Sequence, residues 1–516
     1  MKSRNQIILS IAVLLLATAC SDFFDNKPLT ALTKEEAFSK LENIEPLLSG
    51  LYTNWRDNTR KDRWGLVFQL GTDEAQQGAY QVRTDADQSA MDKYNGFLAP
   101  SNNTLTRQWD DRWRIITSSA AVVSALELNT EDPSRRDMLL GEACFIRAIL
   151  NFEVSLFWGE IPVIDDEIID QYGMGRQPLD RVYALIVKDL ERAVEYLPTT
   201  QSDKRKVTKG AAQTMLGKVY MSAPPEADIR DYAKAAEYFK SVIDNSQYRL
   251  ADNFADLFDA NKPNTTESIY EFQFSNVSPD QNQVQWQTGS RALADAERGY
   301  CYFGGYDLIL PTKYCYSSVE DGGLWEDGDT RRYESIRYDF TYGDFIPVLQ
   351  NWFGGDELSP HIKKYEDIRT DKVMSFWYSG KNIPYLRLAD VYLCYAECLN
   401  EIGRTSEAVE FANIVRMRAW NGSLPDDKKW SSGMSQSDFR VTIMDERMRE
   451  LCFEGWRRMD LIRTGNFVQL IKERNQWARE ESSIQEFHTR FPIPLTEIRQ
   501  NEDINEEDQN PGYKLN

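Results

Sequence analysis

The chain has 516 residues and a formal net charge of -21, with acidic residues spread along its length. This balance argues against a nucleic-acid partner, because phosphate binding needs a basic surface that releases counterions. The length exceeds what one ordinary hydrophobic core supports, although helical-repeat folds avoid that limit by stacking. We therefore expect one large helical body that carries insertions.

The first residues have the pattern of a bacterial lipoprotein leader. A basic start precedes an apolar run from Ile7 to Ala17, and small residues stand before Cys20. A run this short is typical of a cleaved secretory signal and not of a membrane span. We expect residues 1–19 to be a lipoprotein signal peptide, Cys20 to be acylated, and residues 20–32 to form the lipidated tether. The alternative is an ordinary cleaved signal with a chance cysteine.

Residues 33–516 are expected to form a single, mainly α-helical domain. Thr33 and Glu36 have the spacing of a capping box and predict a helix that runs toward Trp55. Helical periodicity then predicts further helices around Trp109–Ile116, Arg136–Trp158 and Asp180–Tyr196.

Two helix pairs have the spacing of tetratricopeptide repeats. The first comprises Lys209–Met221 and Tyr232–Ile243, and the second comprises Arg387–Gly403 and Glu407–Met417. Small residues at the expected contacts allow two helices to approach closely and to bury one seam. Residues 222–226 lengthen the turn of the first pair, so a generic helical hairpin is the alternative there.

Two loop-rich insertions, about 57–105 and 251–384, interrupt the helical pattern. The first has poor helical periodicity, which predicts long ordered loops. The second contains the alternating segment Ser268–Phe274, which predicts short strands in small β-hairpins. The last strong helix is expected to begin near Ser435 and to run through Arg463, followed by a loop-like tail.

The cysteines are too few for a disulfide scaffold. Cys394 and Cys398 lie four apart on one expected helix, and the chain has two histidines in all, so buried thiols fit better than a zinc site. A disulfide between Cys301 and Cys315 is left open. Residues 320–329 are rich in carboxylates but miss the spacing of a calcium loop, so we interpret them as a solvated acidic turn. We expect no metal and no cofactor.

Six segments spread along the chain form one ordered pattern. They are Cys20–Asp25, Glu142–Ala148, Trp158–Val163, Leu386–Glu397, Glu446–Arg463 and Phe491–Tyr513. Read together, they resemble the SusD/RagB family of nutrient-binding outer-membrane lipoproteins of Bacteroidota. Each segment alone is weak, but their shared order from end to end is specific. Gly159–Glu160 stands where a second glycine is frequent in the family, which affects only that turn.

The resemblance implies a mainly helical body with tetratricopeptide-like pairs, exposed on the outside of the outer membrane. It also implies a partner, a TonB-dependent SusC-like barrel transporter over which the lipoprotein sits as a lid. The usual cargo in the family is an oligosaccharide. Residues of the ligand face vary with cargo in this family, so no position carries over by motif.

Sugar binding needs flat rings against the C–H faces of a pyranose and planar polar groups that bridge hydroxyls. Both insertions supply both kinds of side chain, and we predict ligand contacts by Tyr94, Asn102, Trp286, Tyr302 and Trp325. The alternative for any single ring is a place in the core or against the barrel. The wider set is Trp64, Asp73, Glu74, Tyr80, Arg83, Asn95, Phe97 and Asn103 in the first insertion, and Arg291, Tyr300, Tyr306 and Trp352 in the second.

Signals for catalysis are thin. Glu446, Glu450 and Glu454 form an i, i+4 ladder among arginines, which we interpret as a helix face of ion pairs, because a general acid and base must flank a cleft. Neither His361 nor His488 lies in a nucleophile motif. We therefore predict a lipoprotein that captures glycan without cleaving it. The alternatives are a surface glycoside hydrolase on an all-α scaffold and a binder of the same family for peptide or other cargo.

Overall fold

The computed structural model describes residues 38–165, 173–293, 304–338, 340, 358–367 and 378–515. Several predictions concern residues outside these ranges, including the signal peptide and the tether. The individual residues concerned are Cys20, Thr33, Glu36, Tyr300, Cys301, Tyr302 and Trp352.

The described chain is mainly α-helical, and this confirms the predicted fold class. The longer helices are α3 (Leu41–Arg60), α7 (Asn103–Leu128), α8 (Pro133–Trp158), α9 (Leu179–Tyr196), α10 (Lys209–Ser222), α11 (Tyr232–Ile243), α15 (Leu388–Glu401), α16 (Thr405–Ala419) and α17 (Gln436–Leu451). Helices α8, α9, α10, α11, α15 and α16 match the predicted ones within a few residues, whereas α7 extends well beyond the predicted Trp109–Ile116 and α3 begins later than predicted. The shorter helices are α4 (Arg63–Leu66), α5 (Ala79–Thr84), α6 (Ala86–Lys93), α12 (Val284–Thr288), α13 (Lys313–Tyr316), α14 (Thr330–Ser335), α18 (Arg457–Arg463), α19 (Phe467–Arg474), α20 (Gln476–Glu481) and α21 (Leu495–Gln500).

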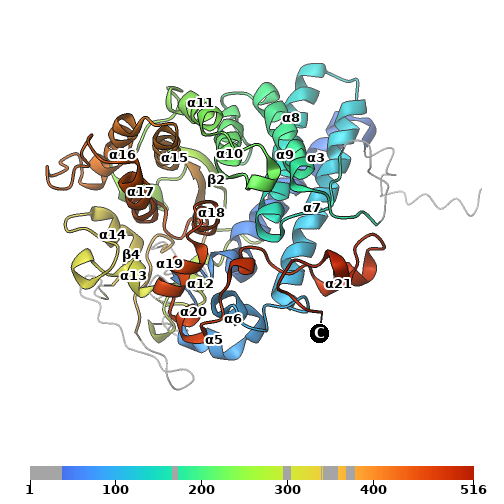
Figure 1. The fold of residues 1–516 in the computed structure, drawn as a ribbon. Coiled ribbons are helices and arrows are strands. Elements are labelled where there is room, and N and C mark those ends of the chain that lie inside the picture. The colour runs from blue at the N-terminus through green and yellow to red at the C-terminus, as the bar shows by residue number, and fades with distance from the viewer. Residues whose placement is uncertain are drawn as a thin grey trace, which may run out of the picture.

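The long helices pack side by side into a curved row. Helix α8 packs against α7 and α9, α10 against α9 and α11, α11 against α15, and α15 against α16 and α17. In Figure 1 this row runs from α3 on the right to α16 and α17 on the left. The pairs α10–α11 and α15–α16 therefore stack in the tetratricopeptide-like manner that the sequence predicts.

A glycine allows close packing in the first pair. A Cβ atom at Gly217 of α10 would lie 2.6 Å from Cε1 of Phe239 on α11. No real side chain tolerates that distance, so the two helices are as close as they are because residue 217 has no side chain. Ala235 of α11 is fully buried as well. Small residues thus set the spacing of this pair.

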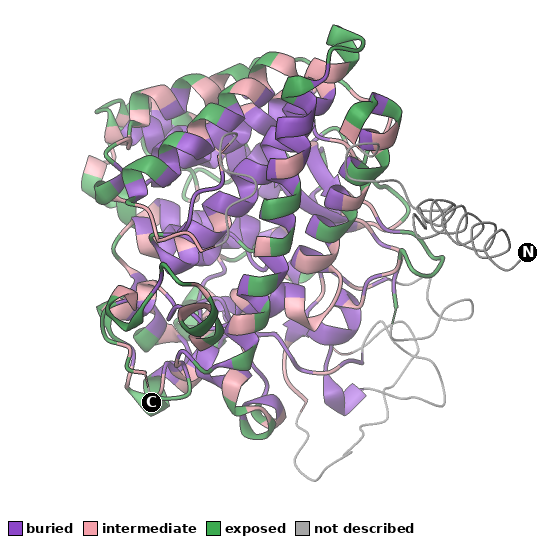
Figure 2. Ribbon diagram, turned by 90° about the vertical axis from the view of Figure 1, so that its right-hand side faces the viewer, coloured by how far each residue is buried: buried purple, intermediate pink, exposed green. Residues whose placement is uncertain are grey.

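The core extends along the inner side of the helical row, as Figure 2 shows by the buried residues in purple. An apolar stripe of α3, formed by Leu41, Ile44, Leu48 and Leu51, is buried in it. One continuous cluster of buried apolar residues reaches from α3 to Ile504 near the end of the chain. The helical row and the carboxyl-terminal segments consequently share one core.

Three small antiparallel sheets tie the insertions to the body. Strand β2 (Ser268–Phe272), which lies in the predicted strand segment, pairs with β6 (Ile383–Arg387). The other pairs are β1 (Ala75–Gln76) with β3 (Leu310–Pro311), and β4 (Ile336–Arg337) with β5 (His361–Ile362). Each pair joins strands that are distant in the sequence, so these sheets are not hairpins.

Three local predictions are wrong. The first insertion contains helices α4, α5 and α6 and not only loops, and the side chain of Asp85 caps α6 by accepting a hydrogen bond from the Gln88 N–H. The expected helix from Ser435 to Arg463 is broken between α17 and α18, where Phe453 and Gly455 have φ values of 67° and 88°. The tail after it holds α19, α20 and α21.

The described cysteines are free and buried: Cys144, Cys315, Cys394, Cys398 and Cys452. This confirms buried thiols at Cys394 and Cys398. The disulfide left open between Cys301 and Cys315 is not tested, because Cys301 lies outside the described residues. In the described ranges, no helix has both the length and the apolar content that a bilayer span requires.

Candidate functional site

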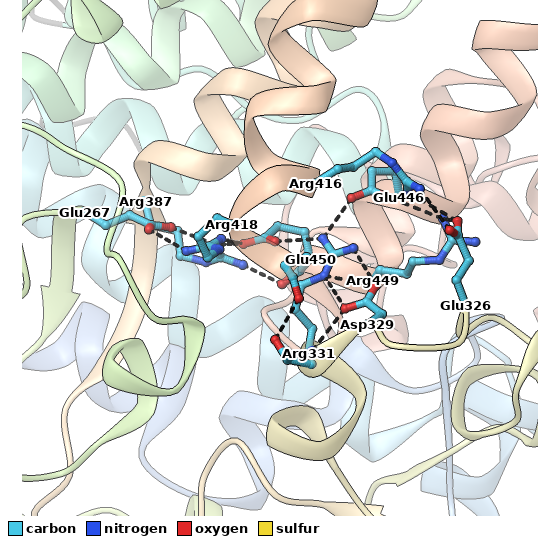
Figure 3. Close-up of polar contacts among 12 residues, drawn as sticks. Glu267, Glu326, Asp329, Arg331, Arg387, Arg416, Arg418, Glu446, Arg449 and Glu450 are labelled. Carbon is cyan, nitrogen blue, oxygen red and sulfur yellow. Dashed lines mark hydrogen bonds and ion pairs between the residues drawn. The ribbon is translucent and has the colours of Figure 1, made fainter. Parts of the chain in front are cut away.

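Helix α17 turns its acidic side chains into the protein interior. Glu446 and Glu450 are completely buried, and Figure 3 shows them among arginines from α14, α16 and β6. Nη1 of Arg331 lies 2.8 Å from Oε1 of Glu446 and 2.9 Å from Oε2 of Glu450. We call this set the buried charge network: Glu267, Glu326, Asp329, Arg331, Arg387, Arg416, Arg418, Glu446, Arg449 and Glu450.

The network neutralises its own carboxylates. Burial alone would raise the pKa of Glu446, but Arg331, Arg416 and Arg449 hold it at about 2. The pKa of Glu450 is lowered too, against burial, by the arginines around it. A general acid needs a pKa near the working pH and access to substrate. The ion-pair interpretation is therefore confirmed, although the paired face is interior and not solvated.

The carboxyl-terminal motif is structural as well. The Tyr513 hydroxyl donates to the carbonyl oxygen of Arg490 at 2.8 Å, and Gly512 makes the turn with φ 89°. The Asn510 side chain donates to the carbonyl oxygen of Trp158 at 2.8 Å. The end of the chain is thereby fastened to the end of α8.

The acidic segment 320–329 contributes to the same interior. Asp329 caps α14 by accepting from the Arg331 N–H, and it also pairs with the Arg331 guanidinium at 2.7 Å. Among the described residues, no group of three or more His, Cys, Asp or Glu side chains is arranged to hold a metal ion. In the segment 320–329, the carboxylate of Asp329 is thus paired with Arg331 and is not part of a solvated turn.

Tyr94 lies inside the protein and not on a binding face. Its ring is only 1% exposed, and its hydroxyl donates to the carbonyl oxygen of Gly71. It also accepts a hydrogen bond from Nη1 of Arg458 at 3.2 Å. Burial raises the pKa of Tyr94 to about 12. These bonds account for the side chain without a ligand.

Asn102 and Trp325 are also buried. Asn102 caps α7 by accepting from the Leu105 N–H, and its amide donates to the carbonyl oxygen of Phe97 at 2.8 Å. The indole N–H of Trp325 donates to the carbonyl oxygen of Cys315. Their polar groups are used in holding loops together, so neither side chain offers a free polar group to a ligand.

The two insertions meet at three aromatic rings and one guanidinium. We call this set the aromatic seam: Tyr80, Trp286, Arg291 and Tyr306. The Arg291 guanidinium lies 3.9 Å from the ring centroid of Tyr80 and 5.7 Å from that of Tyr306. Tyr306 stacks on Trp286 with centroids 6.3 Å apart and an interplanar angle of 27°. Tyr80 and Tyr306 are partly exposed, whereas Trp286 is 7% exposed and backs the seam.

Backbone contacts hold the seam in place. The Gly78 N–H donates to the carbonyl oxygen of Asp307 at 2.9 Å, and a Cβ at Gly78 would lie 2.6 Å from Cβ of Asp307. The Asp307 side chain accepts from the Arg291 N–H at 2.8 Å. The Gln81 amide donates to the carbonyl oxygen of Tyr306 at 2.6 Å. Residues more than 200 positions apart are thus locked side by side by the chain itself.

Of the five predicted contacts, the structure places only Trp286 in this seam, and Tyr302 is outside the described residues. Tyr80, Arg291 and Tyr306 belonged to the wider predicted set but not to the preferred five. Their shared signal is local: each ring or guanidinium stands next to small or polar residues in an insertion. Nothing in the sequence indicates that these particular residues face one another.

Two family models match the chain. The model of the SusD family matches residues 266–513, and a model described as starch-binding associating with outer membrane matches residues 22–221. The SusD-like protein P2 of Formosa agariphila is 28% identical to the chain, with 98% of each covered.

Solved structures share the fold. A SusD homolog from Bacteroides thetaiotaomicron superposes with a TM-score of 0.77 at 22% identity, covering 93% of this chain and 99% of that one. Surface glycan-binding protein A from the same species, in complex with laminarihexaose, has a TM-score of 0.73 at 18% identity, covering 91% and 99%. The chain belongs to the SusD/RagB family.

Proposed function

We propose that this protein binds oligosaccharide at the aromatic seam without cleaving it. The observation that carries the proposal is the pair of partly exposed tyrosines, Tyr80 and Tyr306, held around one guanidinium. Such rings can stack on the C–H face of a pyranose, and the Arg291 guanidinium, which is only 4% exposed, holds both rings from behind. A related fold, surface glycan-binding protein A, was solved with laminarihexaose bound, which supports this class of ligand.

The proposed setting is the outer face of the outer membrane. There, acyl chains on Cys20 anchor the protein through residues 20–32, and a SusC-like TonB-dependent barrel is its partner. The protein then serves as the lid that delivers captured glycan to the transporter. Supporting this are the leader pattern and a family model described as associating with the outer membrane. Labelled palmitate that enters the wild-type chain but not a Cys20→Ala variant is the expected result.

Native affinity gels test the binding. Wild-type protein should be retarded by at least one of laminarin, starch, xylan, mannan or galactan. Tyr306→Ala should weaken this retardation by about tenfold, because one stacking surface is lost. The matched control is Tyr378→Ala, which removes another exposed tyrosine, 39% exposed, that is not part of the seam.

The same samples separate the alternatives. Release of reducing ends by the wild-type protein would favour a glycoside hydrolase. Binding of peptides with no retardation by any polysaccharide would favour a non-glycan cargo. Equal retardation of wild type and Tyr306→Ala would place the glycan elsewhere on the protein and remove the seam from the proposal.

A further inference from the structure

A hollow opens beside α14, and it shares no residue with the aromatic seam. Its volume is about 410 Å³, within the range of small-molecule sites. Its walls come from residues 318–320 and 325–329, from Arg332 and Tyr333 of α14, and from Tyr338 and Lys428. The buried charge network does not account for this hollow. Asp329 lies in its wall, but the Asp329 carboxylate turns inward to Arg331.

Two tyrosines of the hollow are open to solvent. Tyr333 is 53% exposed and Tyr338 is 38% exposed, so both belong to the exposed large apolar side chains of the described chain. Each ring carries a cation on one face: Lys363 Nζ lies 3.6 Å from the Tyr333 centroid, and Arg332 Cζ lies 4.4 Å from the Tyr338 centroid. A cation on one face orients a ring, and the exposed fractions of Tyr333 and Tyr338 leave much of each ring accessible.

Polar groups complete the lining. Glu320 and Asp327 are exposed carboxylates that can accept hydrogen bonds from hydroxyls. The Arg332 guanidinium is fixed by donating to the carbonyl oxygen of Tyr316 at 3.0 Å, and Lys428 adds an ammonium group. Both charge signs are present, so the hollow suits an uncharged ligand with many hydroxyls better than an ion.

We propose that this hollow is a second saccharide site, which binds a neutral oligosaccharide through Tyr333 and Tyr338. The inference extends the proposed function, because it assigns a further site for the same class of ligand. Two sites on one body would hold a long polysaccharide more firmly than one, since the second contact forms at high effective concentration. Short fragments would occupy the two sites independently.

Isothermal titration with laminarihexaose, maltohexaose, xylohexaose and mannohexaose tests the proposal. Wild-type protein should bind two molecules of at least one hexasaccharide, and the Tyr333→Ala/Tyr338→Ala variant should bind one. Asp327→Asn, which keeps both rings, should weaken one of the two sites by a few fold. The control Tyr378→Ala should keep both sites, and thermal melts of all variants should match because the substituted side chains are exposed.

The outcomes distinguish this inference from the proposed function. One site in wild type that is unchanged in the Tyr333→Ala/Tyr338→Ala variant would overturn the second site and leave the seam intact. Binding that survives Tyr306→Ala but disappears in the Tyr333→Ala/Tyr338→Ala variant would support the second site and count against the seam. No binding of any hexasaccharide to wild type would overturn both.

Discussion

The buried charge network and the aromatic seam both use arginine, in opposite ways. In the network, Arg331 and Arg387 are enclosed and meet several carboxylates each. In the seam, Arg291 is also buried, but it lies against two tyrosine rings that are themselves partly exposed. In the network, the charged groups are paired with one another inside the protein, whereas in the seam the rings of Tyr80 and Tyr306 remain accessible. The motif-bearing part of the chain thus maintains the fold, and a part without a motif presents the candidate ligand face.

Glu450→Gln should break the network most severely. It leaves Arg331, Arg387 and Arg418 buried beside a neutral amide, and breaking a buried pair of this kind costs about 3–5 kcal/mol. Urea unfolding should show the loss, which is a large fraction of a typical total stability. As a matched control, Glu407→Gln removes an exposed pair with Arg404 and should leave the midpoint almost unchanged. Equal midpoints for the two variants would contradict the comparison.

Gly217→Ala tests the helical row that carries the network. The new methyl group would collide with the Phe239 ring, and overpacking of this kind costs roughly 1–3 kcal/mol. Gly50→Ala is the control, because nothing lies within 4 Å of a Cβ there and α3 is helical at that point. That control should gain about 0.5–1 kcal/mol from helix propensity. Thermal or urea unfolding of both variants should therefore shift in opposite directions.

Arg291→Gln should sharpen the contrast from the side of the seam. It removes the cation beside the tyrosines but leaves the network untouched, so glycan affinity should fall by about tenfold. Because Arg291 is buried, the free energy of unfolding should also fall, by about 1–3 kcal/mol, which is less than for Glu450→Gln. Affinity gels and urea unfolding on the same preparation measure the two quantities. A stability loss as large as that of Glu450→Gln, with affinity unchanged per folded molecule, would make Arg291 a structural residue only.

The smallest expected effect concerns pH. Burial lowers the pKa of His488 from 6.5 to about 4, while its Nδ1 accepts from the Gln485 N–H at 2.9 Å. As pH falls from 6.5 toward 4, the unfolded chain takes up a proton at this residue that the folded protein does not, so the free energy of unfolding decreases. His488→Gln removes that uptake, and its stability should fall less steeply across this window. Parallel curves for wild type and variant would contradict the assignment.

Much of the fold follows from local sequence, and the site does not. Residue spacing predicts the buried face of α3. It also predicts the helix cap at Ser435, whose side chain accepts a hydrogen bond from the Asp438 N–H. The break after α17 was missed because Phe453 adopts a positive φ without a local signal. Tyr94 looked like a ligand ring because its polar neighbours suggested a surface loop. Its hydroxyl instead satisfies a buried carbonyl that only the tertiary structure brings near.

The position of the network along the chain bears on synthesis. Four of its arginines, Arg331, Arg387, Arg416 and Arg418, precede α17 in the chain, as does Glu267, whereas Glu446, Arg449 and Glu450 arrive with that helix. A nascent chain that ends near residue 430 would have to enclose those four arginines without Glu446 and Glu450, which is strongly unfavourable. The interior can therefore close only after α17 has been made, and truncations before α17 should remain open and sensitive to protease.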